Sequence, residues 1–184
     1  MSDRKVILKM VLSLDGFATS PDGTHEWMFE WFGEDSTERS LRELKDAGVH
    51  AMGRRSYEIM GPYWAASEGP VATAMNETPK AVFSRTLKHP DWGPAEIFGD
   101  LSGGIAELKA RTDGGTVLVH GGPGFAASLT RAGLVDEYRL STVPIAIGAG
   151  RSPFAALDEH LKLDVVEEQR FRSGALAQIL VPRR

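Results

Sequence analysis

Short apolar runs alternate with amphipathic segments over the first two thirds of the chain. Val6–Leu12 and Thr116–His120 are compact apolar runs that end at glycine-containing turns, and each predicts a buried strand. Shorter apolar runs predict further strands at Val49–Met52, Lys80–Ser84 and Ala95–Phe98. Strands separated by helical patterns indicate crossover connections and a largely parallel sheet.

Apolar residues at helical spacing, together with caps and stop residues, predict four helices. The first is capped by Ser36 and runs through about Ala47 with Gly48 as its stop; the others are Arg54–Met60 ended by Gly61-Pro62, Leu101–Ala110, and Phe125–Ala132 ended by Gly133. Two prolines and many small residues predict a loop with at most one helical turn over Tyr63–Pro79.

The last third of the chain is dominated by strand patterns. Val135–Val143 predicts a strand and Pro144–Pro153 a glycine-rich turn. Leu161–Arg172 and Ala175–Val181 predict a hairpin across Ser173-Gly174. The whole pattern therefore predicts one α/β domain over residues 1–184, with a mixed, mostly parallel sheet that is finished by antiparallel C-terminal strands.

Composition and charge narrow the functional classes. The 184 residues carry a net charge of −4 and a pI near 5.7, which argues against broad binding to nucleic acid or to anionic membranes. The absence of cysteine excludes disulfides, thiolate metal sites and a catalytic thiol. The five histidines lack a metal-binding spacing, so we expect no metal site. The short N-terminal apolar run lacks the features of a signal peptide, so we expect a cytoplasmic location.

Three groups of polar and glycine residues follow predicted strands. The first is Gly121-Gly122-Pro123-Gly124-Phe125, where glycines allow close backbone approach and the amides of a starting helix attract phosphate. The second is Gly53-Arg54-Arg55-Ser56, and the third is Ser84-Arg85. Guanidinium and hydroxyl donors in such places suit phosphate oxygens.

Each of these three groups also has a structural interpretation. Glycine-rich strand-to-helix turns are common, the paired arginines fit a solvated helix start, and Ser84-Arg85 fits an ordinary surface turn. All three groups, however, lie at the carboxyl ends of predicted strands, where open α/β sheets generally bind ligands. Together they favour one extended, phosphate-bearing ligand.

Two further segments carry candidate chemistry. Asp15-Gly16 follows the first strand, where the carboxylate could orient a substrate and the glycine could admit a flat ring, or both could form a simple turn. The loop between Ser20 and Glu34 is unusually rich in aromatic residues. Its tryptophans, like Trp64, suit the core or a dimer interface as well as a substrate contact.

The order of these motifs resembles the riboflavin-biosynthesis reductase C-terminal domain family of the dihydrofolate reductase-like superfamily. The segments that carry the resemblance are Ser13-Leu14-Asp15-Gly16, Gly23-Thr24-His25-Glu26-Trp27, Met52-Gly53-Arg54-Arg55-Ser56-Tyr57-Glu58, Phe83-Ser84-Arg85-Thr86-Leu87, Gly121–Gly124 and Pro144–Gly150. The resemblance implies a three-layer α/β/α dihydrofolate reductase-like fold. It also implies an NADPH-dependent oxidoreductase that transfers hydride to a small heterocyclic, pterin- or pyrimidine-like substrate, and a homodimer.

The same resemblance implies a role for each motif. The residues implied to bind NADPH are Gly16, Gly53, Arg54, Arg55, Ser56, Ser84, Arg85, Gly121, Gly122, Pro123, Gly124 and Phe125. Thr24, His25, Trp27 and Met28 are implied to face the substrate.

Several assignments stay open at this point. Asp15 is the candidate to orient the substrate or relay a proton, because a carboxylate buried beside a nicotinamide could have a raised pKa, but Glu26, Glu30 and Asp35 compete for that role. His120 could titrate usefully, although a lone histidine at a strand end is more often structural. The alternatives to a reductase are a non-catalytic nucleotide-binding homodimer of this fold and a structural homodimer without a ligand.

Overall fold

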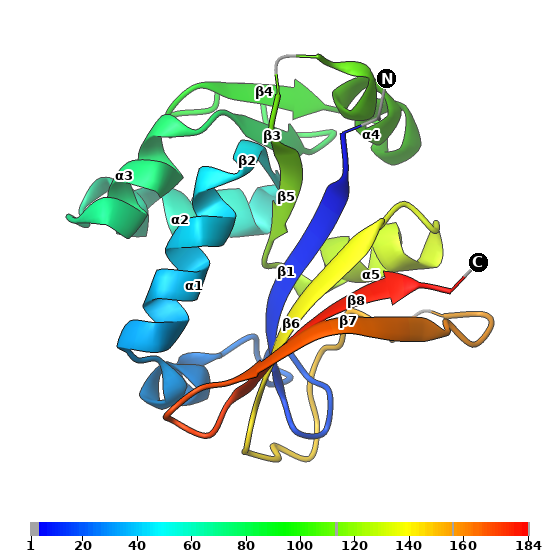
Figure 1. Cartoon of the computed structure of the whole chain (residues 1–184). Coiled ribbons are helices and arrows are strands. Elements are labelled where there is room, and N and C mark those ends of the chain that lie inside the picture. The colour runs from blue at the N-terminus through cyan, green and yellow to red at the C-terminus, as the bar shows by residue number, and fades with distance from the viewer. Residues whose placement is uncertain (1–3, 113, 156, 184) are drawn as a thin grey trace. The chain divides into compact units, whose positions relative to one another are not determined.

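The chain folds into two compact units, each built around four strands. The computed structural model describes residues 4–112, 114–155 and 157–183. The first unit contains residues 39–122 together with the N-terminal segment up to Val6, and the second contains residues 7–38 and those from 123 onward. Figure 1 colours the chain from blue to red, so that most of the first unit appears in cyan and green.

The first unit contains a wholly parallel arrangement of four strands. These are β2 (Ala47–Gly53), β3 (Lys80–Phe83), β4 (Ala95–Phe98) and β5 (Thr116–His120), in the order β4-β3-β2-β5. The central residues of β2, β3 and β5 are buried, as expected for parallel strands covered by helices, whereas the edge strand β4 is partly exposed. Because every strand runs in the same direction, their carboxyl ends lie along one edge of the unit.

Helices connect these strands. They are α2 (Arg54–Ala65), α3 (Pro70–Glu77) and α4 (Leu101–Ala110), while α1 (Glu34–Lys45) leads into β2 and begins in the second unit. On α4, Asp100 accepts a hydrogen bond from the Gly103 amide at 2.6 Å and so caps the helix. Gly104 lies so close to Phe83 and Phe98 that no larger residue would fit, which places α4 against β3 and β4.

A buried polar network holds α2, α3 and the segment before β4 together. The Trp92 amide donates to the Tyr57 hydroxyl at 2.6 Å, and the Trp92 indole donates to the Asn76 side-chain oxygen at 2.7 Å. The Asn76 amide group in turn donates to the Trp64 carbonyl at 2.9 Å. Lys80 completes the network by donating to the Asn76 backbone carbonyl at 2.6 Å, with its ammonium 4.6 Å from the centre of the Trp92 ring.

The second unit is a mixed sheet with an antiparallel finish. Its strands are β1 (Val6–Ser13), β6 (Glu137–Val143), β7 (Leu163–Arg170) and β8 (Leu176–Pro182), in the order β1-β6-β8-β7. β1 and β6 are parallel, whereas β6–β8 and β7–β8 are antiparallel, with β7 and β8 joined as a hairpin at Gly174 (φ +97°). The α/β fold with mostly parallel strands and antiparallel C-terminal strands is therefore confirmed.

The second unit also contains α5 (Pro123–Arg131) and a short 3₁₀ segment, η1 (Glu26–Trp31). Val143, Phe171, Ala175 and Ala177 form a small buried cluster near the turn of the hairpin. Trp27 and Trp31 of η1 pack against this cluster, together with Val11 and Ile145. The aromatic loop thus supplies part of the core of this unit.

Two predictions about the first unit were wrong at glycine and proline positions. α2 continues past Gly61-Pro62 to Ala65, because glycine has no Cβ to clash with the following proline ring and packs directly against Trp92. The stretch predicted as a loop with at most one helical turn contains the eight-residue α3, which begins with Pro70 at its first position after Gly69 (φ +95°).

Two helix boundaries were also wrong. The predicted stop Gly48 belongs to β2 instead, where a Cβ would collide with the Gly114 carbonyl, so that glycine is needed for close approach of two backbones. The helix begins at Glu34, before the predicted cap: Ser36 exchanges hydrogen bonds with the amide and carbonyl of Gly33 at 2.9 Å from inside the first turn.

No helix among the described residues is long and apolar enough to span a membrane.

Lys80 generates a prediction about stability and pH. Burial lowers its pKa from the usual 10.5 to about 8, so the unfolded chain binds more protons than the folded chain between these two values. We therefore expect the free energy of unfolding to rise as pH increases from 8 to 9.5, by roughly 1–2 kcal/mol. Urea titrations at half-unit pH steps measure this rise, and Lys80→Met is expected to abolish it. An equal rise in the Lys80→Met variant would contradict the assignment.

Candidate functional site

The carboxyl edge of the first unit gathers most of the residues predicted to bind the cofactor. In the β2–β3 register, Gly53 lies beside Phe83, and both are the last residues of their strands. Arg54 and Ser84, which follow them, therefore leave the sheet at the same level. Ala51 lies beside Val119 in the β2–β5 register, which brings the end of β5 to this edge as well. Three chain segments that are far apart in the sequence therefore meet here.

The turn after β5 has the backbone conformation that its glycines were expected to provide. Gly121 and Gly122 have φ angles of +53° and +64°, in the left-handed region that other residues rarely adopt. A Cβ on Gly121 would lie 3.7 Å from the Ser56 hydroxyl oxygen, so the start of α2 lies beside this turn. The predicted residues Pro123, Gly124 and Phe125 form the first turn of α5 and belong to the second unit.

The hydroxyl and guanidinium groups at this edge differ in how they are bound. Ser84 accepts hydrogen bonds from the amides of Thr86 and Leu87 at 3.1 and 2.9 Å, which leaves its hydroxyl hydrogen available to donate. Arg54 is bound on two sides, by Glu58 at 2.6 Å and by Thr86 at 2.7 Å. Arg55 and Arg85 are exposed and make no hydrogen bond or ion pair with the described part of the chain.

His50 and His120 form a buried pair beside the glycine turn, since His120 immediately precedes Gly121. Sequence reasoning did not predict this pair. Nε2 of His120 lies 3.0 Å from Nδ1 of His50, and the two rings meet edge to face. Nε2 of His50 lies 3.4 Å from the carbonyl oxygen of Ala74 in α3. This contact favours the structural interpretation of His120, and its partner follows only from the pairing of β2 with β5.

Asp15 holds two loops of the second unit together. Its carboxylate accepts hydrogen bonds from the Ser13 hydroxyl at 2.6 Å, the Ile147 amide at 3.1 Å and the Gly148 amide at 2.7 Å. The Ser13 hydroxyl is the largest cause of a lowered pKa of Asp15; desolvation opposes it, and the Gly148 and Ile147 amides lower the pKa further. A raised pKa was expected for a carboxylate buried beside a nicotinamide, whereas without a ligand this carboxylate is exposed and well supplied with donors. Gly16 beside it has a φ of +85°.

The residues predicted to face the substrate are divided between a turn and a core cluster. Thr24 donates its hydroxyl hydrogen to Asp22 at 2.8 Å, and the ring of His25 lies edge-on to Phe29, with 5.6 Å between ring centres. Met28 is half-buried. Trp27 packs in the hydrophobic cluster, which favours the core interpretation for this tryptophan.

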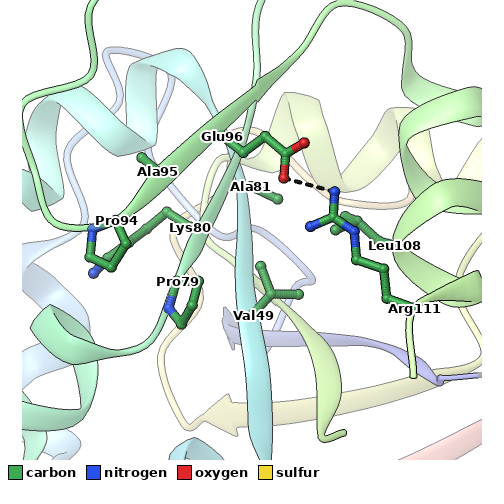
Figure 2. A pocket seen from close by; sticks show the side chains of 9 residues that line it. All are labelled: Val49, Pro79, Lys80, Ala81, Pro94, Ala95, Glu96, Leu108 and Arg111. Carbon is green, nitrogen blue, oxygen red and sulfur yellow. Dashed lines mark hydrogen bonds and ion pairs between the residues drawn. The ribbon is translucent and has the colours of Figure 1, made fainter. Parts of the chain in front are cut away.

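A hollow of about 240 Å³ lies at the opposite end of the parallel strands of the first unit. Its lining includes Pro79 and Pro94, which precede β3 and β4, and Figure 2 shows Glu96 and Arg111 joined across one side, at 2.7 Å. The hollow therefore lies at the amino ends of the strands, whereas ligands of open α/β sheets bind beyond the carboxyl ends.

Among the described residues, no group of three or more acidic or histidine side chains could hold a metal ion.

Comparison with known proteins finds relatives in sequence and a similar fold. The chain is 26% identical to the uncharacterized protein YyaP of Bacillus subtilis over 181 residues, covering 96% of this chain and 94% of YyaP. It is 30% identical to the riboflavin biosynthesis protein RibD of Corynebacterium ammoniagenes over 159 residues, covering 82% of this chain and 46% of RibD. The chain thus spans about half the length of that relative.

The fold is similar to that of dihydrofolate reductase. The enzyme from Enterococcus faecalis, solved as a complex with NADP(H), superposes with a TM-score of 0.64 at 11% identity and covers 98% of this chain and 97% of the enzyme. This similarity confirms the dihydrofolate reductase-like fold. The RibD C-terminal domain family matches residues 4–177, nearly the whole chain. The chain therefore belongs to the RibD C-terminal domain family.

Proposed function

We propose that this protein is an NADPH-dependent reductase that transfers hydride to a small heterocyclic substrate of the pterin or pyrimidine type. The observation that carries the proposal is the carboxyl edge of the first unit, where the guanidiniums of Arg55 and Arg85, unpaired among the described residues, lie with serine hydroxyls and a glycine turn. Membership of the RibD C-terminal domain family supports a reductase. The substrate class is part of the proposal.

The residues at this edge fit a dinucleotide phosphate on physical grounds. Gly121 and Gly122 adopt the left-handed conformation at a strand end, and the absence of side chains there lets phosphate oxygens approach the backbone closely. The exposed Arg55 and Arg85 supply positive charge to a protein whose net charge is −4. Such a local concentration of donors is needed to bind an anion on an acidic protein.

Each group then has a defined role in binding. Arg55 and Arg85 would bind the 2′-phosphate that distinguishes NADPH from NADH, with Ser56 and Ser84 donating hydroxyl hydrogens to neighbouring phosphate oxygens. Gly121 and Gly122 would lie against the pyrophosphate, where a side chain would block the approach. The bound cofactor supplies the hydride, and the protein contributes orientation and the exclusion of water.

The role of Asp15 in this proposal is to hold its own loop against the loop that contains Ile147 and Gly148. Its carboxylate is already bound by the hydroxyl of Ser13 and two backbone amides, and its lowered pKa keeps it ionised at neutral pH. An ionised carboxylate has no proton to give, so we propose that a proton reaches the substrate from water or another group. Homodimer formation and a cytoplasmic location stay predictions.

The arginine assignments predict a change in cofactor preference. Arg85→Ala and Arg55→Ala are each expected to weaken NADPH binding roughly 10- to 100-fold, because each removes a charge-assisted hydrogen bond to phosphate. NADH binding is expected to change less than about threefold. Calorimetric titration of both nucleotides measures the ratio, with Lys45→Ala, an exposed charge in the last turn of α1, as the control. Equal losses for both nucleotides would contradict the 2′-phosphate assignment.

A turnover assay separates the reductase from a non-catalytic nucleotide-binding protein. Oxidation of NADPH is followed at 340 nm with pterins, flavin-pathway pyrimidines and small carbonyls as acceptors. We expect turnover with at least one heterocyclic acceptor and its loss in the Arg85→Ala variant at low NADPH concentration. Tight NADPH binding without turnover across all acceptors would favour the non-catalytic interpretation.

The state of Asp15 predicts a specific titration. The amide resonance of Gly148 reports protonation of the carboxylate that it contacts, so its chemical shift is expected to change with a midpoint below 3.8. Asp15→Asn is expected to remove this titration, and Asp22→Asn is the control in a neighbouring loop. A midpoint above 5 would show that Asp15 can hold a proton near neutral pH and would restore it as an acid.

A further inference from the structure

Arg54 differs from the other two arginines of the edge because its guanidinium is already fixed. Nε donates to the Glu58 carboxylate at 2.6 Å, and Nη1 donates to the Thr86 hydroxyl at 2.7 Å. Glu58 lies one turn further along α2, and Thr86 lies beyond the end of β3. One side chain therefore connects the start of α2 to the segment that follows β3.

Thr86 is itself held in place. Its amide donates to the Ser84 hydroxyl oxygen at 3.1 Å, and the Leu87 amide donates to the same oxygen at 2.9 Å. The turn from Ser84 to Leu87 thus presents the Thr86 hydroxyl at a fixed position. Arg54 is oriented by two acceptors, one on a helix and one on a fixed turn.

The hydrogen bonds of Arg54 leave a defined set of donors for a ligand. A guanidinium carries five N–H groups in one plane, and the two bonds to Glu58 and Thr86 use one on Nε and one on Nη1. The second N–H of Nη1 and both of Nη2 remain for an anion. Arg55 and Arg85 must lose side-chain freedom when they bind, whereas Arg54 has already lost it.

The charge of Glu58 acts in the opposite sense to its orienting effect. Both Arg54 and Glu58 are about half exposed, so their attraction is screened by water and the carboxylate is also felt by any anion that approaches Nη2. A phosphate bound to Arg54 would lie within a few ångströms of this negative charge. Glu58 therefore orients the guanidinium and at the same time weakens its attraction for a phosphate.

We propose that Thr86 and Glu58 set the preference of this protein for a phosphorylated nucleotide through Arg54, with Thr86 aiming the guanidinium and Glu58 limiting its affinity. The inference deepens the proposed function and rests on it, because it concerns the same phosphate-bearing ligand. Thr86 and Glu58 are positioning and specificity residues and need not touch the ligand themselves. The two residues are predicted to have opposite effects, which general damage to the fold would not produce.

The test compares two nearly isosteric substitutions. Thr86→Val keeps the shape and removes the hydroxyl acceptor, and it is expected to raise the Kd for NADPH roughly three- to tenfold. Glu58→Gln keeps an oxygen acceptor for Nε and removes the charge, and it is expected to lower that Kd by a similar factor. The Kd for NADH is expected to change less than about twofold in both variants.

Two controls separate this mechanism from a general effect. Glu107→Gln removes the acid of another exposed helical pair, Glu107 with Arg111, four residues apart in α4, and is expected to leave both Kd values unchanged. In an Arg54→Met background, the effects of Thr86→Val and Glu58→Gln are expected to vanish. The measurements are calorimetric titrations of the full chain at fixed pH and ionic strength, with 2′,5′-ADP as a second probe and melting temperatures recorded for every variant.

The possible results are distinguishable. Opposite shifts for the two variants that disappear without Arg54 support the inference. If wild type prefers NADPH and Arg85→Ala reduces that preference, but Thr86→Val and Glu58→Gln behave like Glu107→Gln, the inference is wrong and the proposed function stands. Shifts that persist in the Arg54→Met background also overturn it. If wild type binds NADPH and NADH equally, the 2′-phosphate assignment and the inference both fail.

Discussion

Parallel pairing of β2 with β3 and with β5 is the constraint on which the candidate site depends. In a parallel arrangement all carboxyl ends fall on one edge, and the Gly53–Phe83 register fixes which residues leave the sheet at the same level. Arg54, Ser84 and Gly121 come together there although they are far apart in the sequence. A shift of this register by one residue would bring a different pair of residues to the edge and would exchange the side chains that pack on each covered face, so packing of the core also preserves the arrangement of the site.

The polar network behind this edge keeps the helices in position. Asn76 joins Trp64 to Trp92, and Tyr57 binds both the amide and the carbonyl of Trp92, which ties α2 and α3 to the segment before β4. Lys80 contributes to this network while losing the hydration of its ammonium, which is a thermodynamic cost at neutral pH. The hollow beside Lys80 lies at the amino ends of the strands, away from the candidate site. This network therefore contributes to the packing of the unit and supplies no residue of the site.

Much of the fold could be predicted from local sequence patterns, and the exceptions have identifiable causes. Apolar runs and turn residues predicted the eight strands and the C-terminal hairpin, because these signals act within a few residues. The stop predicted at Gly48 failed because that glycine is required by the distant Gly114 backbone, a contact that no local pattern contains. α3 was missed because its start at Gly69-Pro70 was interpreted as a loop signal alone.

The candidate site shows the same division. Strand-end motifs indicated Arg54, Arg55, Ser84, Arg85 and the glycine turn, since their position follows from the order of elements. The spacing of Arg54 and Glu58 could have predicted their ion pair, but the part of Thr86 depends on the register of two strands. The pairing of His50 with His120 and the bonds from Ile147 and Gly148 to Asp15 likewise join segments more than sixty residues apart. The lowered pKa of Asp15 follows first from the hydroxyl of Ser13, two residues away, and then from the distant Gly148 and Ile147 amides, which no local pattern contains.

The most direct test of the account is an NMR titration of the ¹⁵N-labelled protein with NADPH. The account predicts that the amide resonances of Arg55, Thr86, Gly121 and Gly122 shift together as the cofactor binds, while those of Glu96 and Arg111 beside the hollow stay in place. Shifts confined to Glu96, Arg111 and their neighbours would place the ligand at the amino ends of the strands. That result would contradict the assignment of the carboxyl edge as the cofactor-binding site.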